Sequence, residues 1–185
     1  MRVIAGRAGG VRLHVPKHGV RPTMDRVKAA IFSSLGEAVI NARVLDLFAG
    51  TGALGIEALS RGASSVTFVD EDRQSIAAIE KNLAQTNFRA RVRQGDVFKF
   101  LQRMPPTEKF EIIFADPPYE KIKSGERFTD KLLANEVVPE ALVANGIFVL
   151  EKRPSEALSK IESWEVVRAR TYGATEVLFL QPREK

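Results

Sequence analysis

A glycine-rich turn between an apolar strand and a helix is the feature of this sequence that most constrains its fold. The run VLDLFAGTGALGIEAL places Gly50, Gly52 and Gly55 between these two elements. Glycine has no Cβ, so the backbone of such a turn can approach a ligand closely. The spacing matches G-x-G-x-x-G, which alone is typical of a nicotinamide dinucleotide site with an acid, here Asp70, about 20 residues further on. A tight turn without any ligand is the alternative.

Short apolar runs alternate with helical patterns along most of the chain. Such alternation predicts βαβ units, and therefore one α/β domain over residues 1–185 with a mainly parallel sheet. The predicted strands are 44–48, 66–70, 90–93, 112–115, 147–150, 165–171 and 176–180. The predicted helices are one capped by Thr23 or Asp25, then 53–60, 76–83, 98–103 and 132–143. No helical pattern separates the last two strands, so they are expected to pair antiparallel.

The first 22 residues are predicted to form a basic β-hairpin arm. Two alternating apolar runs, 2–4 and 11–15, flank the turn dipeptide Gly9-Gly10. We expect this arm, residues 1–22, to project past the edge of the sheet and to take no part in building the site at the glycine-rich turn.

Positive charge is concentrated near the N-terminus. Residues 1–28 contain seven basic side chains and one acid, Asp25, whereas the whole chain has a net charge of +5. A polyphosphate partner such as RNA would be attracted to this segment, although an ordinary solvated basic tail has the same composition. The arginines expected to grip phosphates through paired N–H donors are Arg7, Arg12, Arg21 and Arg26. The rival interpretation is that Arg21 and Arg26 anchor the arm through ion pairs with Asp25.

Three acids lie within or just after the predicted strands near the glycine-rich turn. Asp46 is inside the strand before the turn, Asp70 ends the next strand, and Asp96 follows the strand after that. A buried carboxylate is costly unless it binds something, here loop amides or a cationic ligand. Neighbouring parallel strands end on one side of a sheet, so we expect Asp70 to bind ribose hydroxyls and Asp96 to face the same site. Asp96 can instead cap the following helix, as can Asp72.

The amino-acid composition excludes several kinds of catalytic and metal-binding site. The chain has no cysteine and only two histidines, which excludes disulfides, thiolate metal sites and cysteine nucleophiles. Its apolar stretches are too short to span a membrane, and its first residues are too charged for a signal peptide. The expected location is therefore the cytoplasm.

The stretch FADPPYE combines an acid, two prolines and an aromatic ring directly after an apolar strand. The amino group of a nucleobase is a poor nucleophile because its lone pair is delocalised into the ring. The Asp116 carboxylate and the Pro117 carbonyl, held by the restricted φ of the prolines, could accept both amine hydrogens and favour a pyramidal nitrogen. Tyr119 would stack on the base. A rigid strand exit with a surface tyrosine is the structural alternative.

Taken together and in this order, the runs DLFAGTGALGIEAL, FVDED, QGD and ADPPYE resemble the class I S-adenosylmethionine-dependent methyltransferases that modify amino groups of bases. The runs GRAGGVRLHVP, RPTMDRVKAAIFSSL and RTYGATEVLFL are similar to the guanine-N2 methyltransferases of bacterial small-subunit (16S) ribosomal RNA. The resemblance covers essentially the whole chain. It departs from the family pattern at Ala29, where an acid is expected, and at Ala174, where a polar residue is more usual.

The resemblance implies a Rossmann-like, seven-stranded methyltransferase sheet that binds S-adenosylmethionine and releases S-adenosylhomocysteine. The residues implied in cofactor binding are Asp46, Phe48, Gly50, Gly52, Asp70 and Asp96. The residues implied around the target guanine are Asp116, Pro117, Pro118 and Tyr119. The implied partner is ribosomal RNA or a small-subunit assembly intermediate, and the implied state is a monomer. No metal is expected, because the leaving group of the donor is a neutral thioether.

Three other kinds of function remain open from the sequence. DPPY-like motifs also serve DNA adenine-N6 and protein glutamine methyltransferases, since any planar amino or amide nitrogen poses the same problem. The glycine-rich turn would also suit an NAD-dependent oxidoreductase. A catalytically silent RNA-binding protein with this fold is the third possibility, and an intact Asp116 argues against it.

Overall fold

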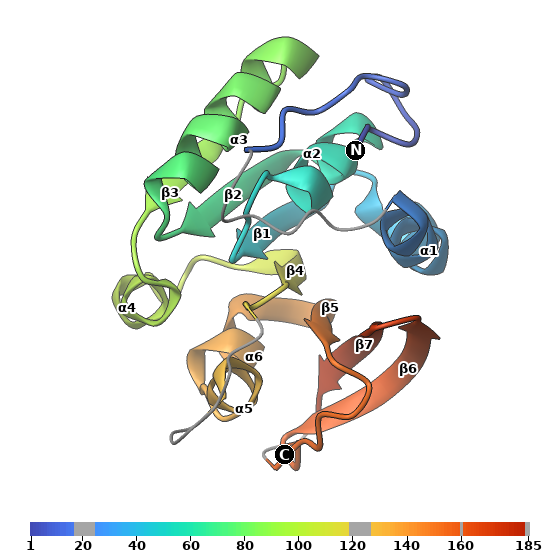
Figure 1. The fold of residues 1–185 in the computed structure, drawn as a ribbon. Helices are drawn as coiled ribbons and strands as arrows, with labels where there is room; N and C mark the ends of the chain where they lie inside the picture. The colour runs from blue at the N-terminus through green and yellow to red at the C-terminus, as the bar shows by residue number, and fades with distance from the viewer. Residues whose placement is uncertain (17–24, 119–126, 160, 184–185) are drawn as a thin grey trace.

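The fold is built on one seven-stranded sheet with the strand order β3-β2-β1-β4-β5-β7-β6 (Figure 1). The computed structural model describes residues 1–16, 25–118, 127–159 and 161–183. The strands are β1 (Arg43–Leu47), β2 (Ser65–Asp70), β3 (Arg91–Gln94), β4 (Phe110–Ala115), β5 (Leu142–Lys152), β6 (Trp164–Tyr172) and β7 (Thr175–Pro182). The first five run parallel, while β7 pairs antiparallel with both β5 and β6. The mainly parallel sheet with antiparallel C-terminal pairing is therefore confirmed.

Helices cover both faces of the sheet (Figure 1). They are α1 (Asp25–Leu35), the 3-10 turn η1 (Gly36–Val39), α2 (Ala53–Ser60), α3 (Arg73–Thr86), α4 (Val97–Arg103), α5 (Phe128–Leu133) and α6 (Val137–Ala141). Side chains of α1, α2 and α3 share one apolar core with alternate residues of the strands, and side chains of α4, α5 and α6 share the other. Strands buried on both faces read as continuous apolar runs, as β1 and β4 do.

The segment predicted as one helix over 132–143 is two short helices. Helix α5 ends at Leu133, and the side chain of Asn135 accepts a hydrogen bond from the Val137 N–H at 2.9 Å. Asparagine side chains that bind nearby backbone compete with the continuation of a helix. The chain therefore leaves α5 after Leu133, and a second helix, α6, begins at Val137. Strand β5 then begins at Leu142, well before the predicted 147.

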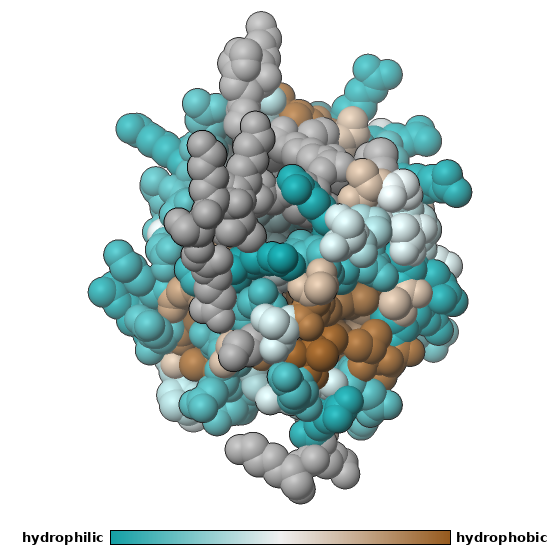
Figure 2. Space-filling view, turned by 60° about the horizontal axis from the view of Figure 1, so that its bottom comes forward, coloured by the Kyte–Doolittle hydropathy of each residue, from teal (hydrophilic) through white to brown (hydrophobic). Residues whose placement is uncertain are grey.

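The edge strand β6 is exposed along most of its length. Among the described residues, the large hydrophobic side chains that remain exposed are Ile40, Val166 and Val167, two of them on this strand. Figure 2 shows a face that is mostly hydrophilic, with a hydrophobic area near its centre. None of the helices in the described ranges is both long and apolar enough to cross a bilayer.

The N-terminal segment packs against the body, so the prediction that it projects past the sheet edge is wrong. Its two runs do pair antiparallel, but through a single bridge between Arg2 and Arg12, and neither forms a strand. Val3 and Leu13 are buried in the core shared with α1 and α2. The backbone at Gly6 comes so close to α2 that a Cβ there would lie 1.9 Å from the Ser60 carbonyl oxygen. Residues 17–22 of the predicted arm lie outside the described residues.

A buried carboxylate holds the N-terminal segment in place. Glu57 on α2 is fully buried and accepts hydrogen bonds from the backbone N–H groups of Ile4 and Ala5 at 2.7 and 3.1 Å. It also pairs with the fully buried Lys28 of α1 at 3.3 Å and with Arg61 at 2.8 Å. The Lys28 ammonium in turn donates to the Arg2 carbonyl. Burial lowers the pKa of Lys28, while Glu57 acts in the opposite direction.

Replacing Glu57 by alanine should destabilise the protein by about 3–5 kcal/mol, because the substitution leaves the Lys28 charge buried without its partner. Urea unfolding measures the loss. Adding Lys28→Met should recover part of it, since no buried charge then remains. The control is Glu37→Ala in the exposed η1 turn, expected within about 0.5 kcal/mol of wild type. A loss similar to that of this control would show that the pair does not hold the segment.

Candidate functional site

The carboxyl ends of four neighbouring strands bring the predicted site residues to one edge of the sheet. Leu47 at the end of β1 is in register with Val69 of β2 and with Ala115 of β4. Asp70 and Asp116 therefore flank the start of the glycine-rich loop, one on each side. The strand order reverses between β1 and β4, and open α/β sheets bind ligands at such a switch point.

Three residues of the glycine-rich loop adopt positive φ: Phe48 at 56°, Gly50 at 55° and Gly52 at 75°. The Asp70 carboxylate fixes this shape by accepting the Gly50 N–H at 2.8 Å through Oδ2 and the Asp72 N–H at 2.9 Å through Oδ1. Asp70 thus orders the loop, a role that the ribose interpretation did not include. The ribose-binding role remains a prediction.

The third glycine of the motif is required by packing. A Cβ at Gly55 would lie 2.3 Å from the Phe68 ring of β2, so only glycine lets α2 approach the sheet this closely. The same holds more mildly at Gly52, whose Cβ would meet the Ile79 side chain at 3.1 Å. These two glycines bring helix and strand together, and the predicted close approach to a ligand rests on Gly50.

Asp46 is a buried acid inside β1, only 2% exposed. Its Oδ2 accepts a hydrogen bond from the Gly55 N–H at the start of α2, at 2.9 Å. This agrees with the expectation that the buried Asp46 carboxylate binds backbone amides of the glycine-rich run. Burial raises the pKa of the Asp46 carboxyl well above its usual range, the Gly55 hydrogen bond lowers it, and the charges of Asp116 and Asp70 raise it further. The three acids are therefore electrostatically coupled at the switch point.

Asp116 directly follows β4 and is partly exposed, and the next residue, Pro117, is buried. Pro118 is exposed, and Tyr119 lies outside the described residues. The structure thus places the Asp-Pro-Pro run beside the glycine-rich loop. The roles of these residues toward a base remain predictions.

Asp96 caps α4, because its Oδ1 accepts the Lys99 N–H at 2.8 Å. Asp72 caps α3 in the same way through the N–H groups of Gln74 and Ser75. The capping alternative is thus observed for both acids. It does not exclude a further contact by Asp96, which stands one strand beyond Asp70 along the same edge.

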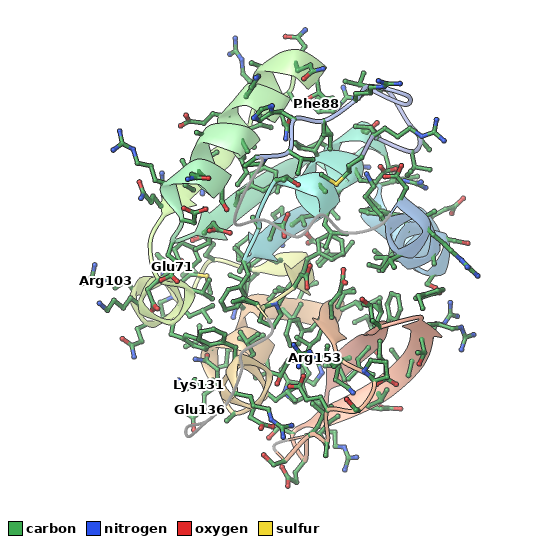
Figure 3. All side chains as sticks on the ribbon, in the orientation of Figure 1. Glu71, Phe88, Arg103, Lys131, Glu136 and Arg153 are labelled. Carbon is green, nitrogen blue, oxygen red and sulfur yellow. The ribbon has the colours of Figure 1, made fainter. Side chains whose placement is uncertain are left out.

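Phe48 belongs to a cluster of three aromatic rings beside the glycine-rich loop. Its ring centroid lies 5.5 Å from that of Phe128 and 6.2 Å from that of Phe98, and the last two rings stack at 5.9 Å. The Lys131 ammonium, labelled in Figure 3, sits 5.9 Å from the Phe98 centroid and 5.7 Å from the Phe128 centroid. The cluster ties the start of α4 and the start of α5 to the loop. Phe98 and Phe128 were missed because nothing in their sequence spacing brings them to Phe48.

Asn82 of α3 connects the N-terminal segment to the glycine-rich loop. Its side chain accepts the His14 N–H at 2.6 Å and donates to the His14 carbonyl and the Thr51 carbonyl, both at 3.0 Å. Neither this contact nor the pair of Lys28 and Glu57 is predicted from the sequence. Each of these three residues is a polar side chain on an otherwise apolar helix face. That pattern, clearest for Glu57, is the feature of the sequence that could have indicated them.

The predicted RNA-binding arginines differ in their surroundings. Arg12 and Arg26 are exposed. Arg7 is also exposed, yet its guanidinium lies 5.2 Å from the centroid of Phe88, labelled in Figure 3, and reaches the Leu59 carbonyl at 3.4 Å. Arg21 lies outside the described residues.

Asp25 pairs with Arg2, at 3.8 Å, rather than with Arg26 as the rival interpretation proposed. Of the two family departures, Ala29 is partly buried on α1 and Ala174 is exposed in the β6–β7 turn. Within the described ranges, no group of three or more histidine, aspartate or glutamate side chains could hold a metal ion.

A seven-stranded sheet with this order, a glycine-rich loop after β1, an acid ending β2 and Asp-Pro-Pro after β4 defines the S-adenosylmethionine-dependent methyltransferase fold. The chain belongs to the family described as "Conserved hypothetical protein 95", which matches residues 1–181.

Similar proteins agree with this assignment. The chain is 37% identical to "Putative rRNA methyltransferase YlbH" of Bacillus subtilis, over 99% of this chain and 100% of that protein. It is 33% identical to "Ribosomal RNA small subunit methyltransferase D" of Haemophilus influenzae, over 94% and 89%. The solved "Putative methyltransferase yhhF" from Escherichia coli superposes with a TM-score of 0.82 at 30% identity, over 100% and 99%. A Thermus thermophilus "16S rRNA N2 G1207 methyltransferase (RsmC)" in complex with AdoMet and guanosine superposes with a TM-score of 0.63 at 25% identity, over 90% of this chain and 44% of that one.

Replacing Asp46 by asparagine should stabilise the unliganded protein more as the pH rises. A carboxyl with a raised pKa holds its proton more firmly when folded, so wild-type stability falls as pH rises from about 3.8, the unfolded value, through the raised folded pKa. Asparagine cannot ionise but still accepts the Gly55 N–H. We expect a gain in the free energy of unfolding near pH 8 that shrinks toward pH 4, measured by urea unfolding across pH. A gain independent of pH would contradict the raised pKa.

Proposed function

We propose that this protein transfers a methyl group from S-adenosylmethionine to the exocyclic N2 amine of a guanine in small-subunit ribosomal RNA. The observation that carries the proposal is the placement of the Asp70-anchored glycine-rich loop and the Asp-Pro-Pro run on either side of β1 at the switch point. A donor held at the loop and a base held at Asp116 would be direct neighbours there, as direct transfer between them requires.

The residues at the loop fit a cationic donor. Burial raises the pKa of the Asp46 carboxyl, and repulsion from the charges of Asp116 and Asp70 raises it further. S-adenosylmethionine carries a positive sulfonium and a positive ammonium, and it supplies an activated methyl group. Its charges would offset the repulsion of the three acids. Asp70 has a second lone pair on each carboxylate oxygen and can accept ribose hydroxyls while it keeps the Gly50 N–H.

Asp116 and Pro117 would act on the base. Their carboxylate and carbonyl oxygens would accept the two N2 hydrogens and direct the nitrogen lone pair toward the methyl group. The N2–carbon bond forms as the carbon–sulfur bond breaks, and the electron pair of the broken bond stays on sulfur as a neutral thioether. The proton that N2 then releases can pass to the Asp116 carboxylate. Most of the rate would come from alignment and from fixed polar groups.

The alternatives are less well supported. Family membership argues against an NAD-dependent oxidoreductase and, together with the retained Asp-Pro-Pro run, against a silent RNA-binding protein. The ribosomal RNA enzymes named above favour RNA over DNA or protein glutamine as substrate. Guanine rather than adenine is favoured by the neighbour solved with guanosine. We further propose that the protein works as a monomer in the cytoplasm, on ribosomal RNA or on an assembly intermediate of the small subunit.

Replacing Asp70 by alanine should weaken S-adenosylmethionine binding by about 1.5–3 kcal/mol, because the carboxylate would bind the ribose and also holds Gly50. Calorimetry measures the affinity. Asp72→Ala is the matched control: it removes a helix cap two residues away and should cost about 1 kcal/mol of stability without changing donor affinity. Unchanged affinity in Asp70→Ala would remove this residue from the site.

Replacing Asp116 by alanine tests the proposed reaction directly. Methyl transfer should fall by about a hundredfold or more while S-adenosylmethionine still binds, because the partner of Asp116 is the guanine amine. The measurement is transfer of labelled methyl to 16S ribosomal RNA, followed by mass spectrometry of its nucleosides. Normal turnover in this variant would make the Asp-Pro-Pro run structural. A product other than N2-methylguanosine from the wild type would refute the guanine assignment.

The arginines of the N-terminal segment can be tested singly, since the structure separates them. Arg12→Gln should lower RNA affinity, and its slope of log affinity against log salt should fall by about 0.7–0.9 with no loss of stability. Arg7→Gln should show a similar slope change together with lower thermal stability, because Arg7 also packs on Phe88. Unchanged affinity and slope in both variants would contradict the clamp role.

A further inference from the structure

The edge strand β3 carries a row of arginines that the methyl-transfer site does not use. The row consists of Arg89, Arg91 and Arg93, and all three side chains are exposed. β3 stands at one end of the strand order, so it forms one edge of the sheet (Figure 1). Residues 89–94 contain three basic side chains and no acid, whereas the chain outside this segment and residues 1–28 has 18 basic and 22 acidic side chains. The β3 arginine row is therefore a second local concentration of positive charge, separate in sequence from the N-terminal segment.

The three arginines share one face of the sheet. Between them, Ala90 and Val92 pack against the core shared by α1, α2 and α3. Side chains alternate along an extended chain, so the β3 arginine row points to the opposite face. Arg93 is in register with Val69 of β2, whose side chain belongs to the core shared by α4, α5 and α6. Helix α4 packs over β2 on this face, and Arg91 and Arg93 stay exposed beyond it.

The spacing and chemistry of the row fit a line of phosphates. Alternate residues of a strand lie about 6.6 Å apart, and successive phosphates of an extended RNA strand have a similar separation. Each guanidinium can grip a phosphate through two parallel N–H donors. Edge strands also carry charge to prevent pairing with other chains, but lysine is the usual residue for that purpose. Glu108 pairs with Arg91 at 3.2 Å, so Arg89 and Arg93 are the stronger candidates for binding phosphate.

The row continues a line of positive charge that begins in the N-terminal segment. The Arg7 guanidinium lies 5.2 Å from the centroid of Phe88, labelled in Figure 3, and Phe88 directly precedes Arg89. From there the row runs along β3 toward the carboxyl end of the sheet, which Arg93 approaches. β2 alone stands between β3 and β1 in the sheet, so the row passes about 10 Å from the strand that leads into the glycine-rich loop.

We propose that the β3 arginine row and Arg7 form a track that binds phosphates of the RNA strand flanking the target guanine. The track leads from the N-terminal segment toward the edge of the sheet that carries the site, so an RNA strand bound along it reaches the place where one of its bases can enter. Its contribution is to affinity, because phosphate contacts position the RNA while the chemistry takes place at the loop and Asp116. This inference rests on the proposed function, since it takes RNA as the partner, and it assigns a surface to that partner.

The test removes two charges from each edge of the sheet in turn. Arg89→Gln with Arg93→Gln removes them from the β3 edge, and Arg168→Gln with Arg170→Gln removes them from the opposite edge strand, β6. The β6 pair is the matched control. Both of its side chains are exposed, and Arg170 donates to the carbonyl of the preceding residue at 3.0 Å, as Arg93 does at 3.4 Å.

Binding to 16S ribosomal RNA is measured over a range of salt concentrations. Each lost phosphate contact lowers the slope of log affinity against log salt by about 0.7–0.9, so the β3 double variant should lose about 1.4–1.8 and the β6 double variant should keep the wild-type slope. Arg93→Gln alone should lose about half as much as the β3 double variant, and it serves if the double variant does not fold. In the methyl-transfer assay, KM for RNA should rise in the β3 double variant while kcat and S-adenosylmethionine affinity stay at wild-type values. A structural defect would not produce that split.

Two results would overturn the inference while leaving the proposed function intact. One is a β3 double variant that keeps the wild-type salt slope. The other is an equal loss of slope in the β3 and β6 double variants, which would show a general effect of net charge. Absence of N2-methylguanosine from the wild-type reaction would instead refute the proposed function, and the salt slopes would still decide whether RNA binds along β3.

Discussion

The parallel pairing of β1 with both β2 and β4 determines where chemistry can occur in this protein. Every strand end that matters for the site points the same way because these strands run parallel. The chain leaves β1 toward one face of the sheet, and the strand order reverses between β1 and β4, so the loops that follow the two strands diverge and leave room between them. The glycine-rich loop and the Asp-Pro-Pro run occupy that place without any long insertion.

The site brings three acids, Asp46, Asp70 and Asp116, together at the switch point. Burial raises the pKa of the Asp46 carboxyl, and the charges of Asp116 and Asp70 raise it further, so ionising this carboxyl is a cost to the folded protein. Such a cost is common where binding of a charged ligand is the purpose. The glycines of the loop have different roles. Gly52 and Gly55 allow α2 to pack closely against the sheet, whereas the N–H of Gly50 is bound by Asp70.

Much of this arrangement could be predicted from the sequence, because it depends on local patterns. Alternating apolar runs predicted the sheet, and the glycine spacing predicted the turn and the helix over 53–60, which α2 matches. The acids were found because each ends or interrupts an apolar run. What could not be predicted depends on partners distant in the chain. The Lys28–Glu57 pair, the role of Asn82 and the aromatic cluster at Phe48 all join residues that no periodicity relates. The N-terminal segment was misplaced for the same reason, since its charge was visible but its buried anchors were not.

Helix α2 is buried on every side, and the N-terminal segment supplies part of its cover. The backbone partners of Ile4 and His14 lie 53 and 68 residues further along the chain. The N-terminal segment can therefore contact α1 early, but it cannot complete its hydrogen bonds until α2 and then α3 have formed. Because Asn82 binds both His14 and Thr51, the last of these contacts joins the N-terminal segment directly to the glycine-rich loop, so that the two become ordered together.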